Sequence, residues 1–208
     1  MLQFPTSTYL HKRLPKEAFY RNLTLSPTVK AHFVSDIDSI YIEYGLSKEN
    51  LNLANDSDIE TIYLMQLILK KQDYDPKILE AIARQNPNRL VFLLVYEDQI
   101  QLALYEKKLY CDSWSSAGEV GLKAQGQSLQ RIWDGFIMQI ALGEGSNSCY
   151  DELPVEERLQ RQDKIKALEK QIIKMEAVER RERQPHKKFE LHQKLELLRE
   201  ELEESRNE

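Results

Sequence analysis

Apolar residues are spaced in two different ways along the chain, and the change of spacing divides it into two parts. The first part carries short runs rich in β-branched and aromatic residues, which are typical of strands: residues 37–44, 59–70, 90–96 and 100–105. The last two runs flank the polar turn Glu97-Asp98-Gln99, and a further extended piece follows from Lys108 to Trp114. This arrangement predicts an antiparallel hairpin or meander.

Helix boundaries in the first part are marked by prolines and capping residues. Pro15, Pro27 and Pro76 each stand in the first turn of an expected helix, where proline is tolerated because that backbone position has no helical partner. Ser128 precedes a segment whose apolar residues recur every three or four positions: Leu129, Ile132, Trp133, Phe136, Ile137 and Ile140. We therefore predict an α+β fold for residues 1–148, with a small mixed or antiparallel sheet and packed helices.

The second part, residues 149–208, is highly charged, yet its apolar residues are ordered. They form two stripes that step by three and four positions, namely Ile165, Leu168, Ile172 and Met175, and then Leu191, Leu195, Leu198 and Leu202. Such stripes predict two amphipathic helices. Pro185 lies between them and would remove a helical hydrogen bond, so the chain must break or bend there. We predict an antiparallel coiled-coil hairpin with its tip near residues 180–188.

Composition narrows the class of protein. The chain has 208 residues and a net charge of -5, which argues against a surface that binds nucleic acid throughout. The two cysteines, Cys111 and Cys149, and the lack of an apolar, signal-like start predict no disulfide framework. The apolar runs are far shorter than the ~20 residues of a membrane span. We expect a cytoplasmic protein that does not bind membranes.

Positive charge gathers at the predicted tip of the hairpin. Five cations lie close together there: Arg180, Arg181, Arg183, Lys187 and Lys188. Such a cluster can bind a phosphate backbone or an acidic protein surface. The alternative is a solvated helix face in which Glu179, Glu182 and Glu190 pair with these cations. We take the five cations as the candidate site for a protein partner or a nucleic acid.

Catalytic patterns are not found in the sequence. It contains neither a G-x-S-x-G nucleophile motif nor a glycine-rich phosphate-binding motif, and Cys111 has no histidine nearby in sequence. His186 and His192 are six positions apart, which places them on different helix faces and predicts no metal site. We therefore predict no catalytic residues, no metal ligands and no cofactor.

A divergent metal-dependent nuclease is the alternative hypothesis. Such enzymes often place an acidic residue before one strand and an acid and a lysine along the next, so that two carboxylates hold Mg²⁺. Asp58, Glu60, Gln66 and Lys70 come near this pattern, but Gln66 stands where the second acid is needed. Because an amide is a poor Mg²⁺ ligand, we prefer to interpret these residues as a core strand with a charged end.

Four segments carry a resemblance to a known family: Leu14-Pro15, the run from Ile62 to Lys70 followed by Ile78-Leu79-Glu80-Ala81-Ile82, the run from Leu90 to Tyr96, and Lys187-Lys188-Phe189-Glu190-Leu191. On these segments the chain resembles the bacterial family known as domain of unknown function 4391. Members of that family look like neighbours of helicase and DNA methyltransferase genes in restriction-like defence clusters. The resemblance implies a non-catalytic accessory or adaptor subunit of an antiphage defence system, bound to a larger helicase or methyltransferase partner.

Overall fold

The computed structural model describes residues 2–53, 58–143 and 154–207. These residues form two compact units, Met1–Asp151 and Glu152–Glu208. The boundary expected between residues 148 and 149 lies outside the described residues.

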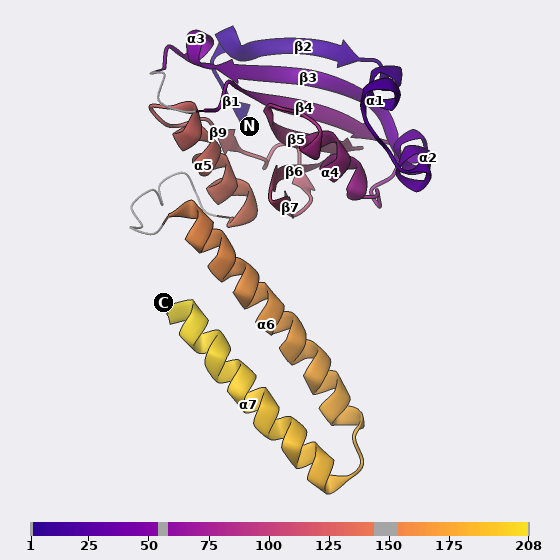
Figure 1. Ribbon diagram of the computed structural model, residues 1–208, viewed down its shortest axis with the longest axis vertical. Helices are drawn as coiled ribbons and strands as arrows, with labels where there is room; N and C mark the ends of the chain where they lie inside the picture. Colours follow the sequence, from indigo (N-terminus) through magenta and orange to yellow (C-terminus); the bar gives the residue numbers. More distant parts are fainter. Residues whose placement is uncertain (1, 54–57, 144–153, 208) are drawn as a thin grey trace. The chain divides into compact units, whose positions relative to one another are not determined.

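The first unit is built on a seven-stranded sheet. Its strands are β2 (Tyr9–Leu14), β3 (Ile37–Ser47), β4 (Thr61–Leu69), β5 (Arg89–Tyr96), β6 (Gln99–Glu106), β7 (Lys108–Cys111) and β8 (Ser115–Ser116). They lie in the order β2-β3-β4-β5-β6-β7, and β8 also pairs with β6 (Figure 1). Only β4 and β5 are parallel neighbours among the described strands of this sheet, so the sheet is mixed. The predicted α+β fold is confirmed.

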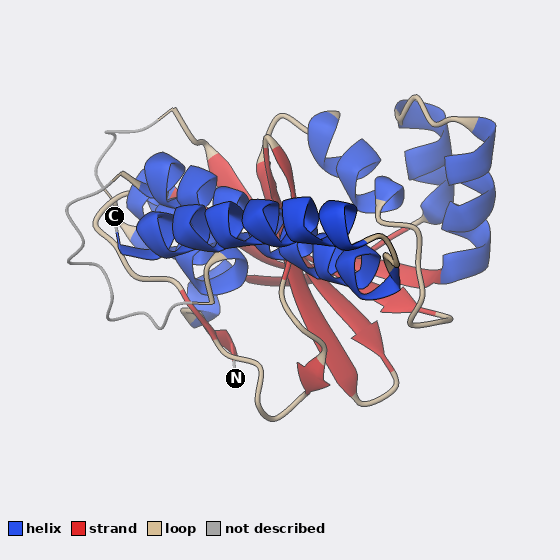
Figure 2. Ribbon diagram, turned by 90° about the horizontal axis from the view of Figure 1, so that it is seen from below, coloured by secondary structure: helices blue, strands red, loops and turns tan. Residues whose placement is uncertain are grey.

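Helices cover the sheet and close its ends. They are α1 (Lys16–Asn22), α2 (Pro27–Asp36), α3 (Lys48–Leu51), α4 (Lys77–Arg84) and α5 (Leu129–Ala141), together with the short 3-10 helix η1 (Thr6–Thr8). Helices α1 and α2 lie side by side at one end of the sheet (Figure 2). Away from it, β1 (Leu2–Gln3) and β9 (Leu122–Lys123) form a separate parallel pair. The helix starts expected at Pro27 and after Ser128 are confirmed. Pro27 is the first residue of α2, and the hydroxyls of Ser26 and Ser128 each accept a backbone N–H three residues on.

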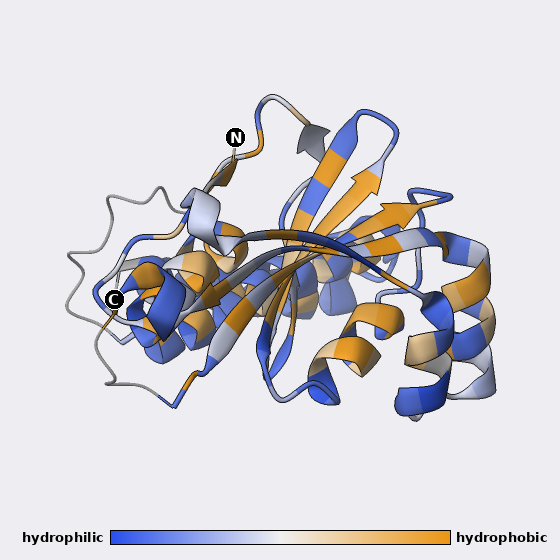
Figure 3. Ribbon diagram, turned by 90° about the horizontal axis from the view of Figure 1, so that it is seen from above, coloured by the Kyte–Doolittle hydropathy of each residue, from blue (hydrophilic) through white to orange (hydrophobic). Residues whose placement is uncertain are grey.

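Alternate residues of β4 face two different layers of the core. Met65 and Leu67 are buried against α2 and α4 in one apolar cluster. Ile62 and Leu64 are equally buried but point to the opposite face, where α5 contacts β4 and β6. Strands in the middle of the sheet are accordingly hydrophobic along much of their length (Figure 3). The outermost strand, β2, is not buried in this way.

The second unit is the predicted helical hairpin. Helix α6 (Val155–Arg181) and helix α7 (Pro185–Asn207) contact each other along their length and are joined by residues 182–184. They are antiparallel, since one ion pair joins Lys164 to Glu201 and another joins Glu179 to His192. Leu168, Ile172 and Leu195 of the predicted stripes are buried. No helix in the described part of the chain is long and apolar enough to cross a membrane.

Candidate functional site

The five cations predicted as a site lie where α6 ends and α7 begins. Arg180 and Arg181 end α6, Arg183 lies in the connecting turn, and Lys187 and Lys188 lie in the first turn of α7. All five are exposed. We call these five residues the tip cluster. Pro185 begins α7, so the break in the helical hydrogen bonding that proline imposes is what brings both halves of the cluster to one turn.

The acidic residues near the tip make other contacts. Glu190 pairs with His186 at 3.2 Å, one helical turn away. The carboxylate of Glu182 accepts the backbone N–H of Gln184 at 2.8 Å, and this bond lowers the pKa of Glu182. Glu179 pairs with His192 at 3.4 Å. The three carboxylates keep their charge beside the cluster, and Lys187 also helps to lower the pKa of Glu182.

The cations of the tip cluster make few direct ion pairs. Arg180 makes a long ion pair of 3.8 Å with Glu176, a residue that also holds Arg199 at 2.9 Å. Within residues 154–207, the other four cations of the cluster make no ion pair. In the solvated-face alternative Glu179, Glu182 and Glu190 pair with these cations. Within the described part of the hairpin none of the three makes an ion pair with the tip cluster, although Lys187 acts on Glu182 at longer range.

A second group of residues is brought together on β2 and β3, and the sequence did not indicate it. Five of the six residues of β2 are exposed, so this edge strand lacks the apolar alternation by which strands are recognised. It lies antiparallel to β3, with Tyr9 opposite Tyr44 and Arg13 opposite Tyr41. Residues directly opposite each other share one face of a sheet. The sequence signal that could have found this group is the short run of aromatic and basic residues from Tyr9 to Arg13, in which only Leu10 is neither.

Three rings on this face form a parallel stack. The rings of Tyr9 and His11 lie 5.8 Å apart with 15° between their planes. The rings of His11 and Tyr41 lie 5.4 Å apart with 13° between their planes. We call Tyr9, His11 and Tyr41 the ring column. At its Tyr9 end the column contacts Tyr44, whose ring centroid is 5.4 Å away.

The ring column is anchored in the core through further aromatic contacts. Tyr44 packs edge-on against Phe4 at 4.9 Å, and Phe4 packs edge-on against Phe136 of α5 at 6.0 Å. Phe136 is fully buried in the layer that α5 forms on this face. The column thus contacts the core through Tyr9, although Tyr9 is itself exposed, and Tyr41 at the other end is partly buried.

Irregular pairing positions the middle ring. Between Tyr9 and Lys12 the register of β2 against β3 shifts by one residue, and His11 has a φ of 45°, in the left-handed region. On the neighbouring strand a second shift makes Glu43 the extra residue of a bulge. Glu43 is 9% exposed, and its two carboxylate oxygens lie 3.0 and 3.1 Å from Nδ1 of His11. The two irregularities turn His11 toward Glu43 and align its ring with the tyrosines.

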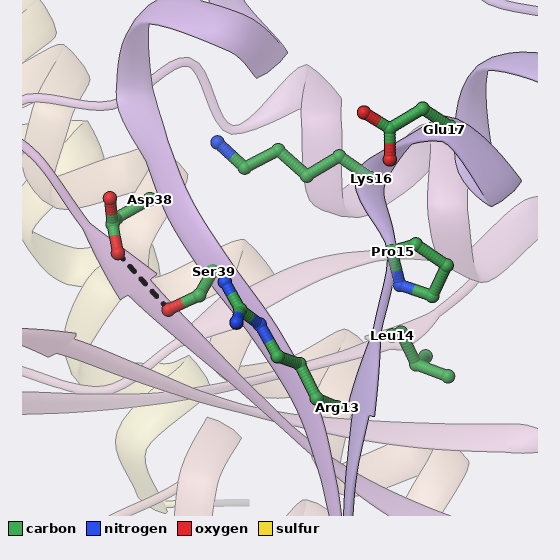
Figure 4. A pocket seen from close by; sticks show the side chains of 7 residues that line it. All are labelled: Arg13, Leu14, Pro15, Lys16, Glu17, Asp38 and Ser39. Carbon is green, nitrogen blue, oxygen red and sulfur yellow. Dashed lines mark hydrogen bonds between the residues drawn. The ribbon is translucent and has the colours of Figure 1, made fainter.

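A cavity of about 520 Å³ lies where β2 leads into α1 (Figure 4). It is lined by Arg13, Leu14, Pro15, Lys16, Glu17, Asp38 and Ser39. The ammonium of Lys16 donates to the carbonyl of Ile37, and Asp38 accepts the hydroxyl of Ser39 at 3.2 Å. Burial, followed by the nearby ammonium of Lys70, lowers the pKa of Lys16. Arg13 makes no hydrogen bond or ion pair with the described residues. We call Arg13, Lys16 and the ring column together the β2–β3 surface.

The residues of the nuclease hypothesis are not brought together. Asp58 and Glu60 precede Thr61, the first residue of β4, whereas Lys70 follows Leu69, the last. Nine strand residues separate the two ends by roughly 30 Å. Among the described residues, no three side chains of histidine, cysteine, aspartate or glutamate are grouped so that they could hold a metal ion.

The family comparison agrees with the resemblance seen in the sequence. A model of the family described as Domain of unknown function (DUF4391) matches residues 2–202, nearly the whole chain. The chain therefore belongs to this family. No curated protein and no solved structure matches the chain.

Proposed function

We propose that this member of the DUF4391 family is a non-catalytic adaptor, in which the tip cluster of the hairpin binds an acidic surface of a larger protein partner. The partner class follows from the resemblance noted above: a helicase or a DNA methyltransferase of a restriction-like defence system. In this proposal the α+β unit and the hairpin supply separate contacts to one assembly.

The observation that carries the proposal is the charge arrangement at the tip. Like charges one turn apart on a helix repel each other and cost about 0.2–0.5 kcal/mol per pair. In this hairpin the nearby carboxylates of Glu179, Glu182 and Glu190 are engaged by two histidines and a backbone amide. An external anionic surface would relieve the repulsion among the cations, and such complementarity favours fast and specific association.

The position of the cluster also supports the proposal. The turn between α6 and α7 carries no buried apolar side chain, so the cations there are not needed for packing. The nuclease alternative, in contrast, rests on carboxylates and a lysine at opposite ends of β4. The geometry therefore favours an adaptor over a nuclease.

The test compares two matched variants of the full chain. The tip triple variant carries Arg181→Gln, Lys187→Gln and Lys188→Gln. The control variant carries Lys166→Gln, Lys170→Gln and Lys174→Gln, three exposed lysines in the body of α6. Both lose three positive charges from the same hairpin, and neither set contributes to its apolar stripes.

Parent and variants are tagged, expressed in the native host, and recovered with their bound proteins for quantitative mass spectrometry. We expect the tip triple variant to recover a helicase or methyltransferase about tenfold less than the parent, with the control unchanged. Equal recovery by all three proteins would contradict a role for the tip. Cleavage of DNA or RNA by the purified parent with Mg²⁺ or Mn²⁺, lost in Asp58→Ala, would instead support the nuclease alternative.

A further inference from the structure

We propose that the β2–β3 surface binds single-stranded nucleic acid, with unpaired bases against the ring column and phosphates at Arg13 and Lys16. This inference concerns the α+β unit and does not rest on the proposed role of the hairpin tip. It is carried by three observations: a rigid ring column whose Tyr9 and His11 are exposed, the cations Arg13 and Lys16 beside it, and irregular strand pairing that maintains both.

The ring column is exposed although it is rigidly held. Tyr9 is 52% exposed, and the side chain of His11 is 55% exposed. Tyr44 and Phe4 anchor the column to the buried ring of Phe136, and Glu43 fixes the imidazole. His11 is stacked between Tyr9 and Tyr41, so a base would stack at Tyr9, the exposed ring at the end of the column. Every base presents a π-face, and a ring held in this way loses little conformational freedom on binding.

Cations continue the row of rings along the same strand. Arg13 lies opposite Tyr41 across the β2–β3 ladder, and Lys16 follows where the chain enters α1. Lys70 lies close enough to Lys16 for the two ammonium groups to interact. The carboxylates of Asp38 and Glu17 also line the cavity and offset part of this repulsion. An anion there would be bound chiefly by the guanidinium of Arg13, which makes no ion pair with the described residues and is suited to bind phosphate through two parallel hydrogen bonds.

Strand irregularities are concentrated at this surface. Each shift in the pairing of β3 with β4 leaves one extra residue on β3: Asp38 in the cavity and Glu43 beneath His11. A third shift, on β2, places His11 itself at a positive φ that non-glycine residues adopt at an energetic cost. Bulges reorient side chains and are common at sheet edges and functional sites. Here the bulges keep the ring of His11 and the cavity in one row along β2, a strand that is roughly 20 Å long.

The geometry favours a single strand over a duplex. In a duplex the bases are stacked on each other and paired, so their faces cannot reach a ring on a protein surface. A flexible single strand can place bases at the column and its backbone along Arg13 and Lys16 at the same time. Because the readout is by stacking and charge, we expect little sequence preference.

The experiment measures fluorescence anisotropy of a labelled oligothymidylate of about 15 nucleotides, within the site sizes of single-strand binders, and of a duplex of the same length. It uses the full chain in two backgrounds, the parent and the tip triple variant. Binding that remains in the tip triple variant is independent of the proposed adaptor contact, so the two proposals can fail separately.

Three variants of the β2–β3 surface are compared. The ring variant is Tyr9→Thr with His11→Asn, which keeps a strand-forming residue and one that tolerates positive φ. Its control is Leu10→Thr, a change of an exposed neighbour on the same strand. The charge variant is Arg13→Gln alone, because Lys16 also holds the carbonyl of Ile37 and its removal could disturb the fold.

We expect the single strand to bind more tightly than the duplex in both backgrounds. The ring variant should weaken single-strand binding about fivefold or more, with Leu10→Thr unchanged. Arg13→Gln should reduce the slope of log affinity against log salt by about 0.7, the loss of one phosphate contact on a single strand. The proposal is overturned if the tip triple variant binds no oligothymidylate, if duplex binds as tightly as single strand, or if the folded ring variant and Arg13→Gln both bind like the parent.

Discussion

Asp36 and Lys71 form an ion pair of 2.9 Å in which the carboxylate side chain is 1% exposed and the lysine side chain is 50% exposed. Asp36 ends α2, and Lys71 lies just beyond β4, so the pair ties together two segments that meet at the end of the sheet. The carboxylate also accepts the hydroxyl of Ser35 and the backbone N–H of Asp75. A buried charge is thereby surrounded by donors, as its burial requires.

Replacing Asp36 by asparagine should destabilise the α+β unit. The amide cannot pair with Lys71 and brings an N–H₂ group into a site built of donors. Removing one partner of a buried pair typically costs about 3–5 kcal/mol, and we expect about 2–3 kcal/mol because Lys71 can return to solvent. Urea unfolding measures the difference. The control is Asp38→Asn, the same change at an exposed position two residues away, which should cost under about 0.5 kcal/mol.

Asp36 should also make stability depend on acid pH. Burial opposes its ionisation, but the Ser35 hydroxyl, Lys71 and the Asp75 amide outweigh it, so the pKa of Asp36 lies below the ordinary value of 3.8. A carboxyl with a lowered pKa stabilises the fold above its unfolded-state pKa, and this stability is lost as pH falls through the folded value. Unfolding free energies between pH 6 and pH 2.5 should therefore fall more steeply for the parent than for Asp36→Asn. If the unfolding free energies of the parent and of Asp36→Asn fell equally with pH, the lowered pKa of Asp36 would be contradicted.

The ionised carboxylate of Asp134 in α5 should destabilise the fold, whereas that of Asp36 stabilises it. Burial raises the pKa of Asp134, an effect that the hydrogen bond from Gln130 opposes and the nearby carboxylate of Glu106 reinforces. At pH 7 the ionised group is therefore unfavourable in the fold. Asp134→Asn should raise the free energy of unfolding at pH 7, measured by thermal unfolding, by an amount on the order of 0.5 kcal/mol. The gain should disappear below the unfolded-state pKa, where the parent carboxyl is protonated in both states.

Two leucines of α7 offer a matched test of the hairpin. Leu195 is 1% exposed and Leu197 is 65% exposed, although they are two residues apart on one helix. Leu195→Ala should destabilise the hairpin by about 2–3 kcal/mol, because it removes a buried side chain and leaves a cavity. Leu197→Ala should change its stability by less than about 0.5 kcal/mol. Thermal unfolding followed by helical circular dichroism distinguishes them, and equal losses would mean that the register of α6 against α7 is wrong.

The division into two units predicts that the first can fold by itself. A chain that ends at Cys149 should be monodisperse and unfold in one cooperative transition. An aggregated or molten product would show that the hairpin completes the core of the first unit. The same truncated chain, once shown to fold, would allow the binding of oligothymidylate to be measured without the hairpin.

Local patterns predicted the elements whose structure depends on near neighbours in sequence. Helices α6 and α7 follow from stripes spaced by three and four residues, and the tip follows from Pro185, because proline breaks a helix wherever it interrupts one. The strand with Ile37, the central hairpin and α5 were likewise predictable, since each buries an apolar face with a recognisable period. The tip cluster could be proposed from sequence for the same reason: its residues are adjacent in the chain.

The β2–β3 surface was decided by tertiary structure. An edge strand that is exposed along its length needs no apolar alternation, so β2 has no periodic pattern to detect. Its rings align only because β2 pairs with β3 about 30 residues later, and three shifts of register then place His11, Asp38 and Glu43. The burial of Asp36 depends in the same way on the end of β4. Sequence periodicity determined which segments fold, whereas pairing between distant segments determined which polar side chains meet.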